Sequence, residues 1–188
     1  MENDVMEGCF CEEELLTSQN SLFLFDEIDK YSSKEIITKL LWMDQNLEDD
    51  KIVKFYINSY GGNLGDTFAI IATIESISKK VVTIGLGKVA SGAAALLMSG
   101  TGGRFIFPRT RVVLHGVFGG YDGDYTSLKN GMIEHEKVQS VWVKYISEKT
   151  KKTEERIRED IDRDVFLSAE EALEYGIIDG IISKIEYN

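Results

Sequence analysis

A serine, a histidine and a group of aspartates are the residues of this sequence that can together perform nucleophilic catalysis. Ser91 lies in the glycine-rich stretch Gly87–Gly100, after the β-branched run Val81–Ile84 and before a run of alanines and leucines. A strand, a turn and a small-residue helix in this order predict a serine at a helix N-terminus, where backbone N–H groups stabilise a developing negative charge. We interpret Ser91 as a candidate nucleophile. The alternative is that it only caps the helix, as serine commonly does.

His115 is the candidate base, because a serine hydroxyl attacks well only when a base takes its proton. It ends the apolar run Arg111–Leu114 and is followed by a glycine. The alternative is a core histidine whose hydrogen bonds are satisfied. The other histidine, His135, stands between Glu134 and Glu136 on a long predicted helix. We expect His135 to be a solvated surface residue.

A third group must hold the tautomer of the imidazole and stabilise the imidazolium. The candidates are Asp160, Asp162 and Asp164, each of which can instead be a solvated charge in a turn. Asp164 adjoins the apolar run Val165–Leu167. We therefore expect its carboxylate to be the half-buried one.

Strands and helices alternate through residue 114, which predicts an α/β domain of βαβ units with parallel strands. We expect strands over 21–25, 52–57, 81–86, 105–107 and 112–114, and helices from Ser32 or Ser33, over 66–78 and over 93–99. Ligand sites in such folds lie at the carboxyl ends of strands. Three of these ends carry Gly61-Gly62, Ser91-Gly92 and His115. The N–H groups of Gly92 and of one glycine in the 61–62 pair are therefore candidate oxyanion donors.

The second half of the chain has a different character. Residues 117–125 are rich in glycine and suit a flexible edge strand, and Ser127–Lys149 reads as a long helix. Its apolar stripe either packs on its own core or protrudes and packs on a neighbouring subunit. Ser168 and Glu171 predict a capping box for the last helix, which Gly176 ends.

Composition limits the class of protein. A chain of 188 residues predicts one domain over 21–188, after an acidic, mobile arm over 1–20. The net charge of −11 argues against nucleic acid or an anionic membrane surface as partner. No apolar run is long enough to span a bilayer. Cys9 and Cys11 read as reduced thiols rather than a disulfide or a metal site, so we expect no metal, no cofactor and a cytoplasmic location.

Four motifs in order along residues 21–182 resemble the ClpP family, the proteolytic subunits of the Clp protease. The chain segments are Tyr56–Gly62 (family YINSPGG), Gly87–Ala93 (GxAASMGA), Arg111–His115 (RVMIH) and Asp162–Asp179 (RDxF[ML]SAxEA followed by EYG[LI][IV]D). The resemblance implies a serine endopeptidase of the ClpP/crotonase-like fold that cleaves unfolded proteins and peptides. It implies that Ser91 is the nucleophile, His115 the base and Asp164 the orienting acid. Gly62 and Gly92 match the oxyanion donors.

The resemblance also implies an assembly. Family members form seven-membered rings that stack into a barrel, a homo-oligomeric tetradecamer, through a strand–helix handle that matches residues 117–150. Polypeptide substrates would lie extended between Gly61-Gly62 and Gly119-Gly120 by β-addition. Arg163 matches an arginine of the ring–ring contact. The partner would be an AAA+ unfoldase of the ClpX or ClpA kind.

The chain departs from the family pattern close to the site. Tyr60 replaces the proline of SPGG, Gly116-Val117 replaces Gln-Pro after the histidine, and Gly92 replaces the usual methionine. Each change gives the backbone more freedom, and the chain reads as a divergent member. The alternatives are a non-catalytic ring subunit that assembles with an active paralogue, or a crotonase-like acyl-CoA enzyme. Retention of a serine, a histidine and an aspartate argues against the acyl-CoA enzyme, which does not need them.

Overall fold

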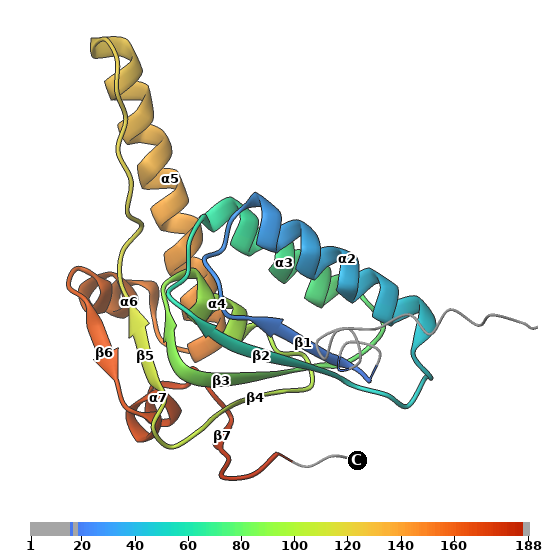
Figure 1. Ribbon diagram of the computed structural model, residues 1–188. Coiled ribbons are helices and arrows are strands. Elements are labelled where there is room, and N and C mark those ends of the chain that lie inside the picture. The colour runs from blue at the N-terminus through green and yellow to red at the C-terminus, as the bar shows by residue number, and fades with distance from the viewer. Residues whose placement is uncertain (1–15, 17–18, 186–188) are drawn as a thin grey trace, which may run out of the picture.

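The computed structural model describes residue 16 and residues 19–185. Most of the expected N-terminal arm, with Cys9 and Cys11, lies outside the described residues. The described chain forms a mainly parallel sheet with helices packed on it, and a long helix that projects from the body (Figure 1). This is the α/β architecture that the alternating pattern predicts.

The sheet has one continuous row of strands, here called the path, and a branch of two further strands that starts from β3. The path runs in the parallel order β1 (Ser21–Leu24), β2 (Val53–Ser59), β3 (Val81–Ala90), β4 (Gly103–Ile106) and β7 (Gly180–Ile181). The branch adds β5 (Arg111–Leu114), parallel to the far half of β3, and β6 (Val165–Leu167), antiparallel to β5. The branch brings the strands that precede Ser91 and His115 side by side.

β3 is longer than the sequence predicts, and the expected end at residue 86 is wrong. Its first half pairs with β4 over 82–85 and its second half pairs with β5 over 88–90. Between the halves, Gly87 has a φ of 53°, a value that favours glycine. The Asn58 side-chain oxygen accepts the N–H of Lys88 at 3.1 Å. The glycine therefore bends the strand, and hydrogen bonds to β2 and β5 keep it extended to Ala90.

Three helices pack on the sheet around an apolar core. They are α2 (Lys30–Asn46), α3 (Leu64–Ser76) and α4 (Gly92–Met98). α2 and α3 lie side by side (Figure 1). Every residue of α4 is buried. The expected caps of α2 at Ser32 or Ser33 are wrong, because Asp29 accepts from the N–H groups of Tyr31 and Ser32 and starts the helix earlier.

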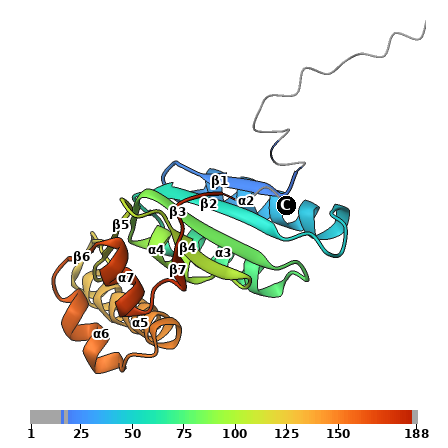
Figure 2. The same ribbon diagram turned by 90° about the horizontal axis from the view of Figure 1, so that it is seen from below.

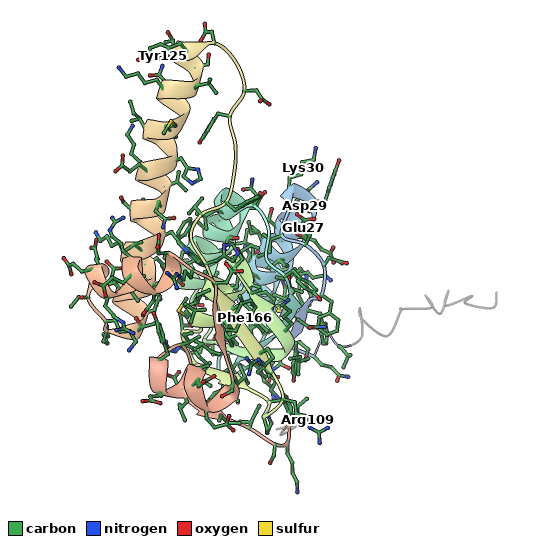
Figure 3. All side chains as sticks on the ribbon, turned by 90° about the vertical axis from the view of Figure 1, so that its left-hand side faces the viewer. Glu27, Asp29, Lys30, Arg109, Tyr125 and Phe166 are labelled. Atoms are coloured by element: carbon green, nitrogen blue, oxygen red, sulfur yellow. The ribbon has the colours of Figure 1, made fainter. Side chains whose placement is uncertain are left out.

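The last third of the chain forms the projection and its base. α5 (Tyr125–Thr150) extends away from the body, with Tyr125 at its far end, while α6 (Glu154–Ile161) and α7 (Ala169–Tyr175) gather near its base (Figures 2 and 3). The predicted capping box of Ser168 and the left-handed Gly176 are confirmed. No helix in the part of the chain that the structure describes has the length and apolar character needed to cross a membrane.

The expected edge strand over 117–125 does not form, because residues 115–122 have no regular secondary structure. From the end of β5 they run alongside α5 to its far end, where that helix begins (Figure 1). The first of these residues bond to side chains of α5 instead of to a neighbouring strand, which explains why no ladder forms.

Candidate active site

Strand register brings the three candidate catalytic residues to one place. Ala90 pairs with Val113 between β3 and β5, and the Ser91 N–H donates to the Val113 carbonyl at 2.9 Å. Leu114 pairs with Val165 in the antiparallel β5–β6 pair. The next step of that register sets His115 opposite Asp164. Residues far apart in the sequence therefore meet at the ends of three adjacent strands.

Ser91 has a strained backbone and a hydroxyl group that makes no capping hydrogen bond. Its φ of 56° and ψ of −127° lie outside the regions that residues other than glycine normally occupy. It sits at the N-cap position of α4, but its side chain makes no capping hydrogen bond. The capping interpretation therefore does not account for this serine. Strained residues of this kind cluster at active sites, because the surrounding structure must hold them in place.

The glycine pair after β2 lies directly against this serine. A Cβ atom on Gly61 would be 2.8 Å from the Ser91 Cβ and 2.8 Å from the Gly92 nitrogen, and its φ of 94° also requires glycine. The Ile28 N–H donates to the Gly61 carbonyl, and the Asn63 N–H donates to the Ile28 carbonyl. In this parallel bridge the N–H of Gly62 lies on the edge that faces away from Ile28. It is therefore available to an anionic group.

Gly92 is held firmly, and the atoms packed around it leave no room for a side chain. It is buried as the first residue of α4, so its N–H has no acceptor within the helix. A Cβ atom there would lie 2.5 Å from Thr67 Oγ1. The Thr67 hydroxyl is itself fixed, because it donates to the Asn63 carbonyl at 2.8 Å. The freedom expected of a glycine at this position is therefore limited by tight packing.

His115 has the tautomer that a general base needs. Its Nδ1 lies 2.6 Å from the Gly116 carbonyl oxygen. A carbonyl oxygen only accepts hydrogen bonds, so Nδ1 is the donor, and in the neutral imidazole this tautomer leaves the lone pair on Nε2. In addition, the Trp142 indole N–H donates to the His115 carbonyl at 2.9 Å.

His115 and Asp164 line one groove, and Ser91 directly follows the strand that pairs with β5. Ser91, His115 and Asp164 all belong to the described residues, and no hydrogen bond links any two of these side chains. The expectation that Asp164 is half-buried is wrong: it is exposed, as are the two residues before it in the turn between α6 and β6. Asp160 is committed elsewhere, since it accepts from Tyr175 Oη at 2.7 Å and from Arg156 Nε at 3.0 Å. Catalytic hydrogen bonds are often long in unliganded enzymes, so this spacing is compatible with catalysis.

An open groove adjoins the histidine. It has a volume of about 1450 Å³ and is lined by His115, Asp162, Asp164, the segment 116–121 and one side of α5. Gly119 and Gly120 are exposed on it, and nothing lies within 4 Å of a Cβ atom placed on Gly120. The groove offers extended backbone and open space next to the candidate base.

Two polar side chains of α5 in this groove are not recognisable from the sequence as site residues. The Gln139 side-chain oxygen accepts the Val117 N–H at 2.6 Å, and His135 Nε2 donates to the Val117 carbonyl at 3.0 Å. His135 is therefore half-buried and hydrogen-bonded, and the expectation of a solvated residue is wrong. Only the four-residue spacing of the two side chains on a helix indicates that they share a face.

Comparison with known proteins identifies the family of the chain. A sequence model of the Clp protease family matches residues 8–185. The chain belongs to the Clp protease family. The ATP-dependent Clp protease proteolytic subunit 1 of Corynebacterium glutamicum is 37% identical to it over 168 residues, which cover 88% of this chain and 80% of that protein.

Membership of the Clp protease family confirms the resemblance seen in the four motifs. The chain is a proteolytic subunit of the Clp protease type and a serine peptidase, and its mixed α/β structure agrees with the Clp protease fold. Clp protease family members partner Clp ATPases and form oligomeric rings. Among the described residues of this Clp protease, no group of three or more His, Cys, Asp and Glu side chains is arranged to hold a metal ion.

Proposed function

We propose that this chain cleaves polypeptides through an acyl-enzyme formed on Ser91. The observation that carries the proposal is the state of this serine, which is strained, free of capping bonds and held at the start of α4 beside the strand that precedes His115. His115 is the proposed general base. Asp164, opposite His115 in register, is the proposed carboxylate that stabilises the imidazolium.

The proposed reaction has two halves. Ser91 Oγ attacks the scissile carbonyl carbon while His115 Nε2 takes the hydroxyl proton, and the tetrahedral oxyanion accepts from the N–H groups of Gly62 and Gly92. His115 then gives the proton to the leaving amine as the C–N bond breaks, which leaves an ester on Ser91. Water attacks the ester, His115 takes its proton, and the proton returns to Ser91 as the new carboxyl group leaves.

Substrate binding is proposed to use backbone contacts. Gly62 and the segment Gly119-Gly120 are exposed, and the edge of Gly62 that faces away from Ile28 is not paired with another described strand. An extended peptide between them would add as a strand, which recognises main chain and tolerates many side chains. This mode suits an enzyme that acts on unfolded chains of varied sequence.

The proposed assembly is a pair of stacked seven-membered rings fed by an AAA+ unfoldase of the ClpX or ClpA kind. Apolar side chains along α5 and the adjoining loop are exposed, which supports contacts with other subunits: Phe118, Tyr125, Leu128, Met132 and Ile133. Arg163 is proposed to join the ring–ring contact. Since an unfoldase needs ATP, we propose a cytoplasmic location.

Labelling with a fluorophosphonate probe tests the proposed nucleophile. We expect wild-type protein to be labelled, and Ser91→Ala and His115→Ala to lose labelling and peptide cleavage by at least about a thousandfold. Ser99→Ala is the matched control, because Ser99 is a buried serine at the other end of α4 whose hydroxyl donates to Leu96. Labelling that survives Ser91→Ala would refute the assignment. Folded, assembled protein that is neither labelled nor active would favour the non-catalytic ring subunit.

A further inference from the structure

One peptide unit connects the proposed base to α5. The Gly116 carbonyl accepts from His115 Nδ1 at 2.6 Å, and the Val117 N–H of the same peptide bond donates to Gln139 Oε1 at 2.6 Å. Because a peptide bond is planar and trans, its carbonyl and N–H point in opposite directions. Gln139 therefore holds the N–H end of this peptide plane, and the carbonyl end of the same plane faces the His115 imidazole.

The same face of α5 fixes the neighbouring backbone groups. His135, Gln139 and Trp142 are spaced four and three residues apart, so they lie on one side of the helix. Their side chains bond to the Val117 carbonyl, the Val117 N–H and the His115 carbonyl. The Gly116 N–H donates to the Ile161 carbonyl at 3.1 Å. The orientation of the Gly116–Val117 peptide is thus determined by α5 and the residue that ends α6.

This arrangement accounts for a departure from the family motif. A proline after the histidine, as in the motif HQP, carries no N–H and has a fixed φ. Val117 carries an N–H that is half-buried and needs an acceptor. Gln139 supplies that acceptor, so a hydrogen bond restrains the peptide where a proline ring would otherwise do so.

We propose that Gln139 is a positioning residue that holds His115 in its Nδ1-protonated tautomer through the Gly116–Val117 peptide. The proposal rests on the proposed role of His115 as general base. Asp164 is exposed and not bonded to His115, so the Gly116 carbonyl is the group that sets the tautomer before substrate binds. Hydrogen bonds in a chain polarise one another, so the bond that the Val117 N–H donates to Gln139 strengthens the bond that Nδ1 donates to the Gly116 carbonyl.

Removing the acceptor tests the proposal. Gln139→Leu keeps the shape but lacks the oxygen, and we expect kcat to fall about tenfold or more with KM changed less than about twofold. Gln139→Glu keeps an oxygen acceptor, and we expect kcat within about threefold of wild type. Gln45→Leu makes the same chemical change at an exposed site on α2 and is the control. Wild-type kcat in Gln139→Leu, or an equal loss in Gln139→Leu and Gln139→Glu, would overturn the proposal.

Two further measurements test the proposal, and the second uses wild-type protein alone, so it does not depend on how well Gln139→Leu folds. Val117→Pro removes the N–H itself, so in that background we expect Gln139→Leu to cause no further loss of kcat. The imidazole nitrogen chemical shifts of wild-type protein are simple to assign, because the chain has two histidines. We expect a protonated Nδ1 in neutral His115, and a protonated Nε2 would overturn the proposal.

The same assay separates this proposal from the proposed function. If His115→Ala keeps full activity, the role of His115 as base is wrong. If His115→Ala is inactive and Gln139→Leu is fully active, only the positioning role of Gln139 is wrong.

Discussion

Thr67 occupies the space that a side chain on Gly92 would need. The Thr67 hydroxyl lies 2.5 Å from the position of a Cβ atom on Gly92, and Thr67 is fully buried. It also bonds to the carbonyl of Asn63, the residue after Gly62. Thr67 therefore packs between the two segments that carry the proposed oxyanion donors.

Adding a methyl group at this contact should destabilise the protein. We expect Gly92→Ala to lower the free energy of unfolding by about 1–3 kcal/mol, because the core around Thr67 is already full. In a Thr67→Ala background the added cost should be smaller, since space is available there. Denaturant unfolding of the two single variants and the double variant measures this coupling. Gly120→Ala is the control, with nothing within 4 Å, and full additivity of Gly92→Ala and Thr67→Ala would contradict the prediction.

The strain at Ser91 predicts a difference between two inactive variants. At a φ of 56° and a ψ of −127°, alanine retains the steric cost that glycine escapes. We expect Ser91→Gly to be more stable than Ser91→Ala by about 1 kcal/mol, since residues in such regions cost about 1–3 kcal/mol and glycine loses some of this in the unfolded chain. Denaturant midpoints of the two variants check this. An alanine variant that is as stable as the glycine variant would show that the backbone is not strained.

Replacing two aspartates near the site should have opposite effects on activity and on stability. Asp164 is exposed, so Asp164→Asn should change the free energy of unfolding by less than about 0.5 kcal/mol. Its kcat should fall at least about a hundredfold, because the imidazolium loses its carboxylate. Asp160 bonds to Tyr175 and Arg156, so Asp160→Asn should destabilise by about 1–3 kcal/mol and leave kcat nearly unchanged. Peptide cleavage and thermal unfolding measured together test the pair, and a reversed pattern would reassign the carboxylate.

The pair of Arg104 and Asp179 predicts a pH dependence of stability. The hydrogen bond from Arg104 lowers the pKa of Asp179 below its ordinary value. The pair therefore stabilises the fold above the ordinary pKa of about 4, and the contribution is lost as pH falls through the lower, folded-state pKa. Asp179→Asn should be less stable than wild type by about 1 kcal/mol at neutral pH, because the carboxylate is partly exposed.

Unfolding of both proteins between neutral and acidic pH measures the effect. We expect the difference between wild type and Asp179→Asn to shrink below about pH 4. A difference that stays constant down to acid denaturation would show that the ion pair does not contribute.

Local signals in the sequence predicted much of the fold, and they proposed the residues of the candidate site, whose roles stay a prediction. The alternation of apolar runs gave the strands and helices up to Leu114, and the Ser168 capping box and Gly176 mark the ends of α7 correctly. These features depend on residues close together in the chain. The bend of β3 at Gly87 was missed, because a glycine that interrupts a strand and one that bends it look the same without the neighbouring strands.

By itself, the sequence determined the family and supplied the candidates for the reactive residues, since both depend on side-chain types at given spacings. The tertiary structure decided which of those side chains are buried and which are bound by other hydrogen bonds. Pairing across β3, β5 and β6 brought Ser91, His115 and Asp164 together, and packing on α5 gave half-buried His135 and Gln139 their backbone partners. Hydrogen bonds and burial arise between segments distant in sequence, so only the folded chain specifies which serine hydroxyl is uncapped and which carboxylate is exposed.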